Sequence, residues 1–170
     1  EYNVSELTEF RKQKDLFFET DSHSPLTQEQ RENFKGLIYF DEDRSLKLEL
    51  TIEEFADKEE IQMQTTTGDL QIYKRFGKIK FPVDGKDEEL TVFASSHGFF
   101  LPFVDAQAGR ETYGAGRYLD PHMLPNGKLL VDFNLAYNPY CAYNELYSCP
   151  LPPAENRLKV AIQAGEKTFK

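Results

Sequence analysis

Tryptophan is absent from this sequence of 170 residues, and only two cysteines, two methionines and three histidines occur in it. The histidines are scattered, and their spacing relative to the cysteines does not resemble a set of zinc ligands. No apolar run approaches the roughly 20 residues that a membrane-spanning helix needs. The formal net charge is −9, and no basic run is longer than Lys74-Arg75. We therefore expect no metal or cofactor, no membrane segment, and no nucleic-acid surface, which would require basic patches.

The composition is that of a folded domain. Hydrophobic residues make up 39% of the sequence, and an aromatic share of 14%, all phenylalanine and tyrosine, can fill a core. At this length we expect one domain over residues 1–170 that folds without disulfides. The first residues lack the features of a signal peptide, which favours a cytoplasmic protein. The sequence begins with Glu1, however, so a removed leader stays open, and so does the oligomeric state.

Residues 1–36 are predicted to be helical. Asn3 and Glu6 have the spacing of a capping box, with asparagine in place of the usual serine or threonine. Apolar residues then recur at helical intervals, namely Val4, Leu7, Phe10, Phe17 and Phe18. This pattern predicts a helix that begins close to the start of the sequence.

A second helix should follow a break at residues 21–25, because proline disfavours helical backbone in the residue before it. Thr27 and Gln30 have capping-box spacing, and Gly36 can end the short helix that they start. We expect these two short helices to pack on a β-rich body of residues 37–170.

From residue 37 onward the hydrophobic pattern has a period of two, which predicts strands. Asp84-Gly85 is a strong hairpin signal, because both central positions of that turn favour positive φ. The expected strands are 46–52, 61–65, 70–72, 79–83, 90–92, 99–104, 129–135 and 158–164, with Gly165 turning the chain toward 168–169. Their short spacing indicates an antiparallel meander rather than parallel βαβ units. The predicted fold class is mainly β, α+β by its N-terminal helices, as a small barrel or sandwich.

Residues 131–156 are the most informative part of the chain. Both cysteines and many tyrosines, prolines and asparagines are concentrated there, with few charged residues. Buried phenols and amides need fixed hydrogen-bond partners, so this composition suits a shaped and partly buried polar region. The segment predicts the place of a site without naming a reaction.

Three strings carry a resemblance to a known family: ETYGAGRYLD at 111–120, DFNLAYNPYC at 132–141 and CPLPPAEN at 149–156. The closing AGEK at 164–167 also fits. Over most of its length the chain resembles the uncharacterised prokaryotic family called domain of unknown function 1684. The resemblance implies that these strings belong to one feature, and it implies no reaction, ligand or catalytic residue.

Gly114 to Arg117 invites comparison with a phosphate-binding loop. The string lacks the third glycine of a dinucleotide site and the lysine of a P-loop, so a strand entry or β-bulge is favoured. Arg117 lies between two tyrosines, and its guanidinium can clamp a carboxylate. We expect an internal partner, Glu111 or Asp120, ahead of a carboxylate on a ligand.

Cys141 and Cys149 are separated by seven residues. A disulfide between them would contribute roughly 2.5 kcal/mol on the chain-entropy model, and it would require an oxidising compartment. We expect free, buried and poorly reactive thiols. A catalytic Cys141 would need a base such as His97 or His122 beside it.

Polar residues of 131–156 have two interpretations. Asp132 and Asn134 share one face of a predicted strand and would suit a small polar ligand, but such residues often bond the neighbouring backbone instead. Glu155 and Asn156 follow two prolines and can likewise cap an irregular segment rather than touch a ligand.

His97 lies in a loop between two strands, a position that carries function more often than a strand does. His122 precedes Pro125-Asn126-Gly127 and is predicted to lie in a surface turn.

Three hypotheses for function remain. The leading one is a pocket for a small polar or anionic molecule, formed by segments 111–120 and 131–156. Its candidate residues are Tyr113, Arg117, Tyr118, Asp132, Asn134, Asn138 and Tyr140, with His97, Glu111, Cys141, Cys149, Glu155 and Asn156 as secondary candidates. The second is an enzyme at the same place, with Asp132 or Glu111 as general base or Cys141 as nucleophile. The third is a structural or interaction protein without a ligand.

Overall fold

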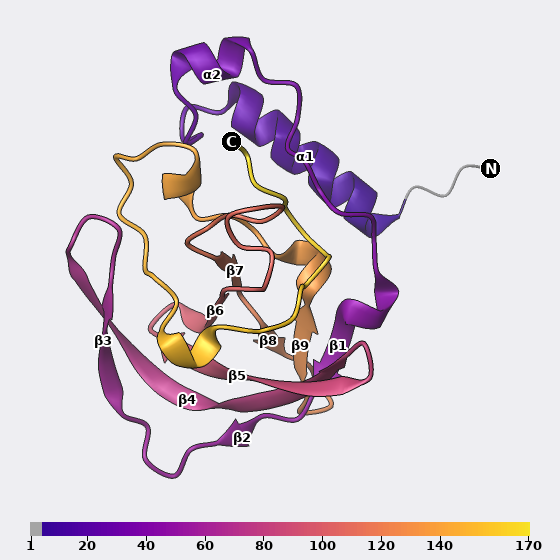
Figure 1. Ribbon diagram of the computed structural model, residues 1–170, viewed down its shortest axis with the longest axis vertical. Helices are drawn as coiled ribbons and strands as arrows, with labels where there is room; N and C mark the ends of the chain where they lie inside the picture. The colour runs from indigo at the N-terminus through magenta and orange to yellow at the C-terminus, as the bar shows by residue number, and fades with distance from the viewer. Residues whose placement is uncertain (1–4) are drawn as a thin grey trace.

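Two antiparallel sheets form the body of the protein, and the α-helices α1 and α2 lie together at one end of them (Figure 1). The structure is a computed structural model that describes residues 5–170. The larger sheet has the order β2-β4-β5-β6-β7 with β3 also paired to β4, and the smaller has the order β1-β9-β8. The strands are β1 (Lys47–Leu50), β2 (Glu53–Glu54), β3 (Glu60–Gln64), β4 (Leu70–Val83), β5 (Lys86–Ser95), β6 (Gly98–Phe103), β7 (Arg117–Leu119), β8 (His122–Met123) and β9 (Leu129–Asp132).

The fold is mainly β, as the period-two pattern predicted. Between them, the two sheets and the irregular C-terminal part enclose one large apolar cluster. It includes Ile79 and Phe81 of β4, Phe103 of β6 and Val131 of β9, all almost fully buried. Over residues 5–170 the sheets do not close into a barrel, so the sandwich is the alternative that the structure supports.

β4 is longer than its sequence pattern suggested. Phe76 and Gly77 were expected to separate two strands, but they lie inside one strand with a register shift between Arg75 and Gly77. A Cβ at position 77 would lie 2.6 Å from the Glu53 carbonyl oxygen, because β2 pairs with β4 there. Gly77 therefore allows the backbone of β2 to approach β4 closely at a bulge, and it does not end β4.

The predicted hairpin at Asp84-Gly85 is confirmed. Both residues have positive φ, 50° and 81°, and they join β4 to β5. Asp84 is the one non-glycine residue with positive φ among those that the structure describes. That geometry is the one that the Asp-Gly pair favours in a two-residue turn.

Helix α1 (Glu6–Thr20) begins after Ser5, whose hydroxyl accepts a hydrogen bond from the backbone N–H of Thr8. The predicted cap Asn3 and the apolar Val4 lie outside the described residues. Helix α2 (Gln28–Glu32) has the predicted capping box of Thr27 and Gln30. It ends before Gly36 is reached.

Two predicted strands are wrong in whole or in part. The segment 129–135 is a strand only to Asp132, where it turns into a 3-10 helix (Phe133–Leu135). The segment 158–164 forms no strand, and neither does 168–169. In place of a neighbouring strand, the guanidinium of Arg117 donates to the carbonyl oxygens of Ile162, Ala164 and Glu166. The end of this alternating apolar segment therefore bonds a side chain, whereas Leu158 and Val160 bond the backbone of Val104 and Ala106.

The helices of the described chain are short or polar. None has both the length and the apolar character that crossing a membrane would require.

Candidate functional site

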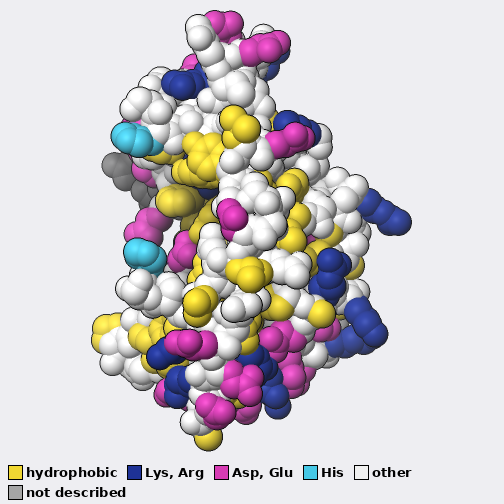
Figure 2. Space-filling view, turned by 90° about the vertical axis from the view of Figure 1, so that its left-hand side faces the viewer, with side chains coloured by type: hydrophobic (Ala, Val, Ile, Leu, Met, Phe, Trp, Pro, Cys, Tyr) yellow, Lys and Arg dark blue, Asp and Glu magenta, His cyan; other side chains and the backbone are white. Residues whose placement is uncertain are grey.

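An open hollow, here called the aromatic cleft, lies between α1 and the segment 137–149. Its volume is about 660 Å³. Three separate parts of the chain line it: Phe10, Gln13, Lys14, Phe17 and Phe18 from α1, Tyr118 from β7, and Tyr137, Pro139, Tyr140, Tyr147, Ser148 and Cys149. Figure 2 shows hydrophobic side chains gathered around a hollow in the upper half of the molecule, near the helices. The two segments singled out from composition do meet here.

The inner wall consists of two tyrosines held by their backbones and by their hydroxyls. Tyr118 and Tyr137 exchange two backbone hydrogen bonds, of 2.9 and 3.0 Å. The Tyr118 hydroxyl donates to the Pro150 carbonyl oxygen, and the Tyr137 hydroxyl donates to Asp120 at 2.7 Å. Burial raises the pKa of both phenols, so both rings are neutral at physiological pH.

A short helix positions the outer wall of the cleft. Pro139 precedes a 3-10 helix (Tyr140–Ala142), which turns the Tyr140 ring edge-on to Tyr147 with 5.2 Å between centroids. Tyr147 remains 36% exposed and Phe10, across the cleft on α1, 48% exposed. Large aromatic side chains are thus left facing water in a concave place.

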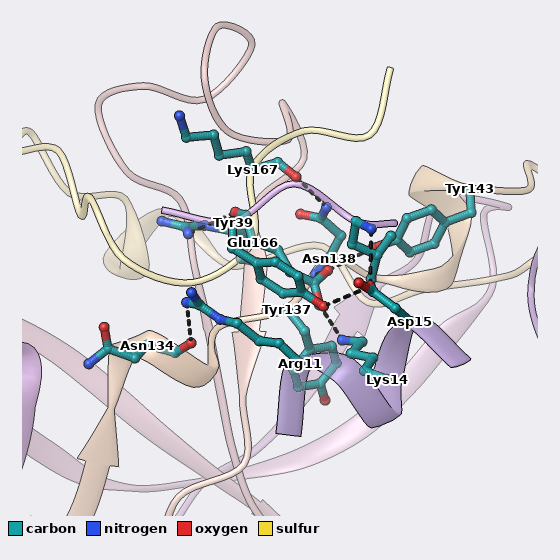
Figure 3. Close-up of polar contacts among 12 residues, drawn as sticks. Arg11, Lys14, Asp15, Tyr39, Asn134, Tyr137, Asn138, Tyr143, Glu166 and Lys167 are labelled. Atoms are coloured by element: carbon teal, nitrogen blue, oxygen red, sulfur yellow. Dashed lines mark hydrogen bonds and ion pairs between the residues drawn. The ribbon is translucent and has the colours of Figure 1, made fainter. Parts of the chain in front are cut away.

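A buried carboxylate anchors α1 to the body beneath the cleft (Figure 3). Glu166 is 2% exposed and accepts hydrogen bonds from Lys14, from the Tyr143 hydroxyl at 2.7 Å and from the Asn138 backbone at 3.1 Å. The Lys14 ammonium also lies 5.2 Å from the centre of the Tyr137 ring. Lys14 therefore brings a positive charge to the cleft, and Glu166 balances much of it.

Arg117 serves the core and not the cleft. It is 1% exposed, and its partner is Asp105, at 3.6 Å, where Glu111 or Asp120 had been expected. Burial lowers the pKa of Arg117 to about 10, while Asp105 and Glu166 act to raise it, so the guanidinium stays charged at neutral pH. The predicted internal partner is thus confirmed in kind, although the residue differs.

Arg117 and Asp132 were expected to share one pocket wall, and this is wrong. The hairpin after Pro121 pairs β8 with β9, so Asp132 lies in the smaller sheet and Arg117 in the larger one. Asp132 accepts from the backbone and side chain of Asn134 at 3.0 and 2.9 Å. Asn134 in turn exchanges two hydrogen bonds with the backbone of Asp43. Both residues line a different hollow, of about 620 Å³, beside the start of α1.

Most of the other predicted site residues bind neighbouring parts of the chain. Asn138 binds the Lys167 carbonyl oxygen, and Asn156, fully buried, holds Thr91 of β5 and Pro102 of β6 through three hydrogen bonds. Glu155 pairs with Arg75 at 2.6 Å.

The remaining candidates lie near the surface or beside a thiol. Glu111 lies 3.8 Å from Lys167, and His97 is exposed in the turn between β5 and β6. Tyr113 lies 3.6 Å from the Cys141 sulfur. His122, expected in a surface turn, is exposed but belongs to β8.

The residues contributed by α1 were missed. Phe10, Lys14 and Phe17 follow one another at helical spacing, and the two phenylalanines were used only as part of the apolar stripe that predicts a helix. The available signal was the lysine within it, since a cation between two phenylalanines marks a face that is not fully buried.

Within residues 5–170 no group of three or more histidine, cysteine, aspartate and glutamate side chains is placed to hold a metal ion.

Comparison with known proteins identifies relatives without a known activity. The profile of a family described as "Protein of unknown function (DUF1684)" matches residues 32–167. The solution NMR structure of an uncharacterized protein from Haloarcula marismortui is similar, with a TM-score of 0.70 and 38% sequence identity. The match covers 95% of this chain and 92% of that one. Among curated proteins, no match was found.

Proposed function

The chain belongs to the DUF1684 family, and we propose that it binds a small molecule in the aromatic cleft. One observation carries the proposal: aromatic side chains from three separate parts of the chain line a single concave space and remain partly exposed there. Exposed aromatic surface is unfavourable in water, and a chain that keeps it in a hollow gains from a ligand that covers it. The volume, about 660 Å³, falls within the range of small-molecule pockets.

The lining indicates the class of ligand. Flat aromatic walls favour a planar ring that stacks or meets them edge-on. Polar groups are fewer: the Gln13 amide, the hydroxyls of Tyr140, Tyr147 and Ser148, and the Lys14 ammonium. The ammonium has three N–H donors and gives one to Glu166. We propose a ligand with an aromatic ring and a small polar or anionic group directed toward Lys14.

An enzyme using Cys141 has one observation in its favour, because the pKa of that thiol is lowered to about 6. A catalytic thiolate also needs a proton donor and acceptor beside it. The three histidines are all exposed, and within the described chain none is hydrogen-bonded to either cysteine. Asp132 and Glu111, the two candidate bases, do not line the aromatic cleft. Binding is therefore the better-supported function.

We also propose a cytoplasmic location. Its support is that Cys141 and Cys149 are both free thiols although they are neighbours in space, which suits a reducing compartment. Cell fractionation with an antibody to the native chain would test this, and recovery outside the cytoplasm would contradict it.

Binding is best tested by NMR, with chemical shifts followed during titration of matched fragments. Benzyl alcohol and benzoate share a ring and differ in charge, whereas acetate carries the charge alone. We expect both ring-containing fragments to shift resonances around Tyr147 and Phe17, and benzoate to bind more tightly if the anionic group contacts Lys14. Acetate should shift neither.

Two variants make the test specific. Tyr147→Ala removes part of the wall and should weaken fragment binding at least about fivefold, as expected for loss of roughly 1 kcal/mol of aromatic contact. Leu146→Ala is the matched control, because the neighbouring Leu146 side chain is 88% exposed and does not line the cleft. Fragment shifts elsewhere on the surface, or shifts that survive Tyr147→Ala, would contradict the proposal.

A further inference from the structure

Two thiols lie side by side at the edge of the aromatic cleft. Cys141 belongs to the 3-10 helix (Tyr140–Ala142), and its backbone N–H donates to the Cys149 sulfur at 3.3 Å. Each side chain is 7% exposed, and the two are not bonded to each other. Sequence alone predicted two inert packing groups, but the fold brings these sulfurs together.

Hydroxyl groups surround the pair. The Tyr113 hydroxyl lies 3.6 Å from the Cys141 sulfur, and the Thr66 hydroxyl accepts a hydrogen bond of 3.2 Å from the Cys149 backbone. Thr66 also donates its own N–H to the Cys149 carbonyl oxygen at 3.0 Å. These bonds hold the position of Cys149 against the loop that follows β3.

The two thiols differ in acidity. A hydrogen bond from Cys149 lowers the pKa of Cys141 to about 6, and the Tyr113 and Thr66 hydroxyls add to this effect against burial. The pKa of Cys149 is raised, because its proton is held by the Cys141 sulfur and because it is buried. A thiolate beside a protonated thiol is the arrangement in which oxidation of the first sulfur can be resolved by the second.

We propose that Cys141 and Cys149 form a reversible intramolecular disulfide when a peroxide oxidises Cys141. In the first step the Cys141 thiolate attacks one peroxide oxygen, the O–O bond breaks, and hydroxide leaves and takes up a proton as water. Cys141 is then a sulfenic acid. In the second step the Cys149 sulfur attacks the Cys141 sulfur, the S–O bond breaks, and the proton lost by Cys149 leaves with the hydroxyl group as a second water. The peroxide is reduced by two electrons, and the two thiols are oxidised.

The location of the disulfide connects it to the cleft, and this part of the inference rests on the proposed function. Cys149 lines the cleft directly. The disulfide would close a covalent ring of residues 141–149, which contains Tyr147 and directly follows Tyr140 in the sequence. The Cys149 sulfur that would form the bond is also the atom that accepts the Cys141 N–H. We therefore infer that oxidation changes the outer wall of the cleft and with it the affinity for a ring-containing ligand.

Intact-mass spectrometry of the whole chain tests the chemistry. Reduced protein treated with hydrogen peroxide should lose two hydrogens, remain monomeric on a denaturing gel, and regain them with dithiothreitol. Cys149→Ser should stop at a sulfenic acid, seen as one added oxygen that dimedone captures. Cys141→Ser should react at least about tenfold more slowly, because its remaining thiol is not a thiolate. Wild-type protein that keeps both hydrogens, or forms only intermolecular disulfides, would overturn the proposal.

Titration of benzyl alcohol into reduced and oxidised protein tests the link to the cleft. We expect at least about a threefold difference in affinity, and no difference for Cys141→Ser treated identically, because that variant forms neither the disulfide nor the Cys141 sulfenic acid. Equal affinities for the two forms would refute the link. Absence of binding to the reduced protein would refute the proposed function instead, and the mass measurement would still decide whether the disulfide forms.

Discussion

Arg117 and Asp105 face each other inside the protein, with 3.6 Å between Nη2 and Oδ2 and each side chain 1% exposed. The arginine gives its other donors to three carbonyl oxygens of the C-terminal segment, and the aspartate accepts from the Thr112 hydroxyl at 2.6 Å and the Ile162 backbone at 2.8 Å. The two side chains of this ion pair thus supply part of the hydrogen bonding of a segment that has no strand beside it.

Replacing this arginine should therefore unfold the protein more readily. Arg117→Met leaves a buried carboxylate and three carbonyl oxygens without their partner, at a cost of about 3–5 kcal/mol in the free energy of unfolding. Urea denaturation measures the cost. Arg110→Met, in the exposed loop before β7, is the control and should change stability by less than about 0.5 kcal/mol. A stable Arg117→Met protein would mean that the buried ion pair and the three hydrogen bonds contribute little to the free energy of unfolding.

Lys14 should be the residue that holds α1 against the body. Lys14→Met leaves Glu166 buried without its cation, and we expect a loss of about 3 kcal/mol, at the lower end for a buried pair because the Lys14 side chain is 18% exposed. Lys12→Met, two residues earlier and exposed, should be nearly neutral. Equal stability of the two variants in urea would show that the ion pair contributes little.

Stability should depend on pH through the cysteine pair. The pKa of Cys141 is lowered from 9.0 to about 6, so the folded state releases this proton before the unfolded state does. The stabilisation of the folded state by this lowered pKa is fully present above the pKa of the thiol in the unfolded chain. It is lost as the pH falls through about 6. The raised pKa of Cys149 acts in the opposite sense and removes stability above the unfolded value.

Thermal unfolding of reduced protein should consequently show a Tm that rises from about pH 6 to about pH 9 and then falls. Cys141→Ser should lose the rise, and the fall above about pH 9 should become smaller, because the Cys141 sulfur is the first cause of the raised Cys149 pKa. A difference between wild type and Cys141→Ser that stays constant over this range would contradict the lowered pKa.

Gly116 precedes β7 at a place where only glycine fits. Its φ is 99°, and a Cβ there would lie 2.6 Å from the Phe103 carbonyl oxygen. Gly116→Ala should cost about 3–4 kcal/mol, from positive φ and overpacking together. Gly109→Ala is the matched control, because Gly109 has φ of 85° with open space around it, and it should cost only about 1–2 kcal/mol. Similar losses for the two variants, measured in urea, would show that crowding at Gly116 is relieved by a small shift.

Local features of the fold were predictable from short stretches of sequence. The Asp84-Gly85 turn and the Thr27–Gln30 capping box depend on residues within four positions of one another, and both are confirmed. The bulge at Gly77 was not predictable, because the reason for that glycine is the backbone of Glu53, a partner distant in the sequence. A glycine in a strand indicates a bulge, a bend or a close backbone approach, but it does not identify the segment that approaches.

Part of the site was predictable as well. Composition located the region 131–156, since clustered phenols and amides need fixed partners wherever they are placed. It did not separate Tyr140, which lines the cleft, from Asn156, which only joins strands. The difference lies in which side chains reach solvent, and that is a property of the packed molecule.

By itself the sequence determined most of the period-two strands, the Asp84-Gly85 turn, the start of α2 and the segment where polar and aromatic groups gather, because each depends on neighbours along the chain. Only the tertiary structure decided that Arg117 would turn inward to the C-terminal carbonyls, that Phe10 and Phe17 of α1 would face the tyrosines of 137–147, and that two sulfurs would meet. These contacts join residues far apart along the chain or across an irregular loop, and their geometry is settled only when the core has packed.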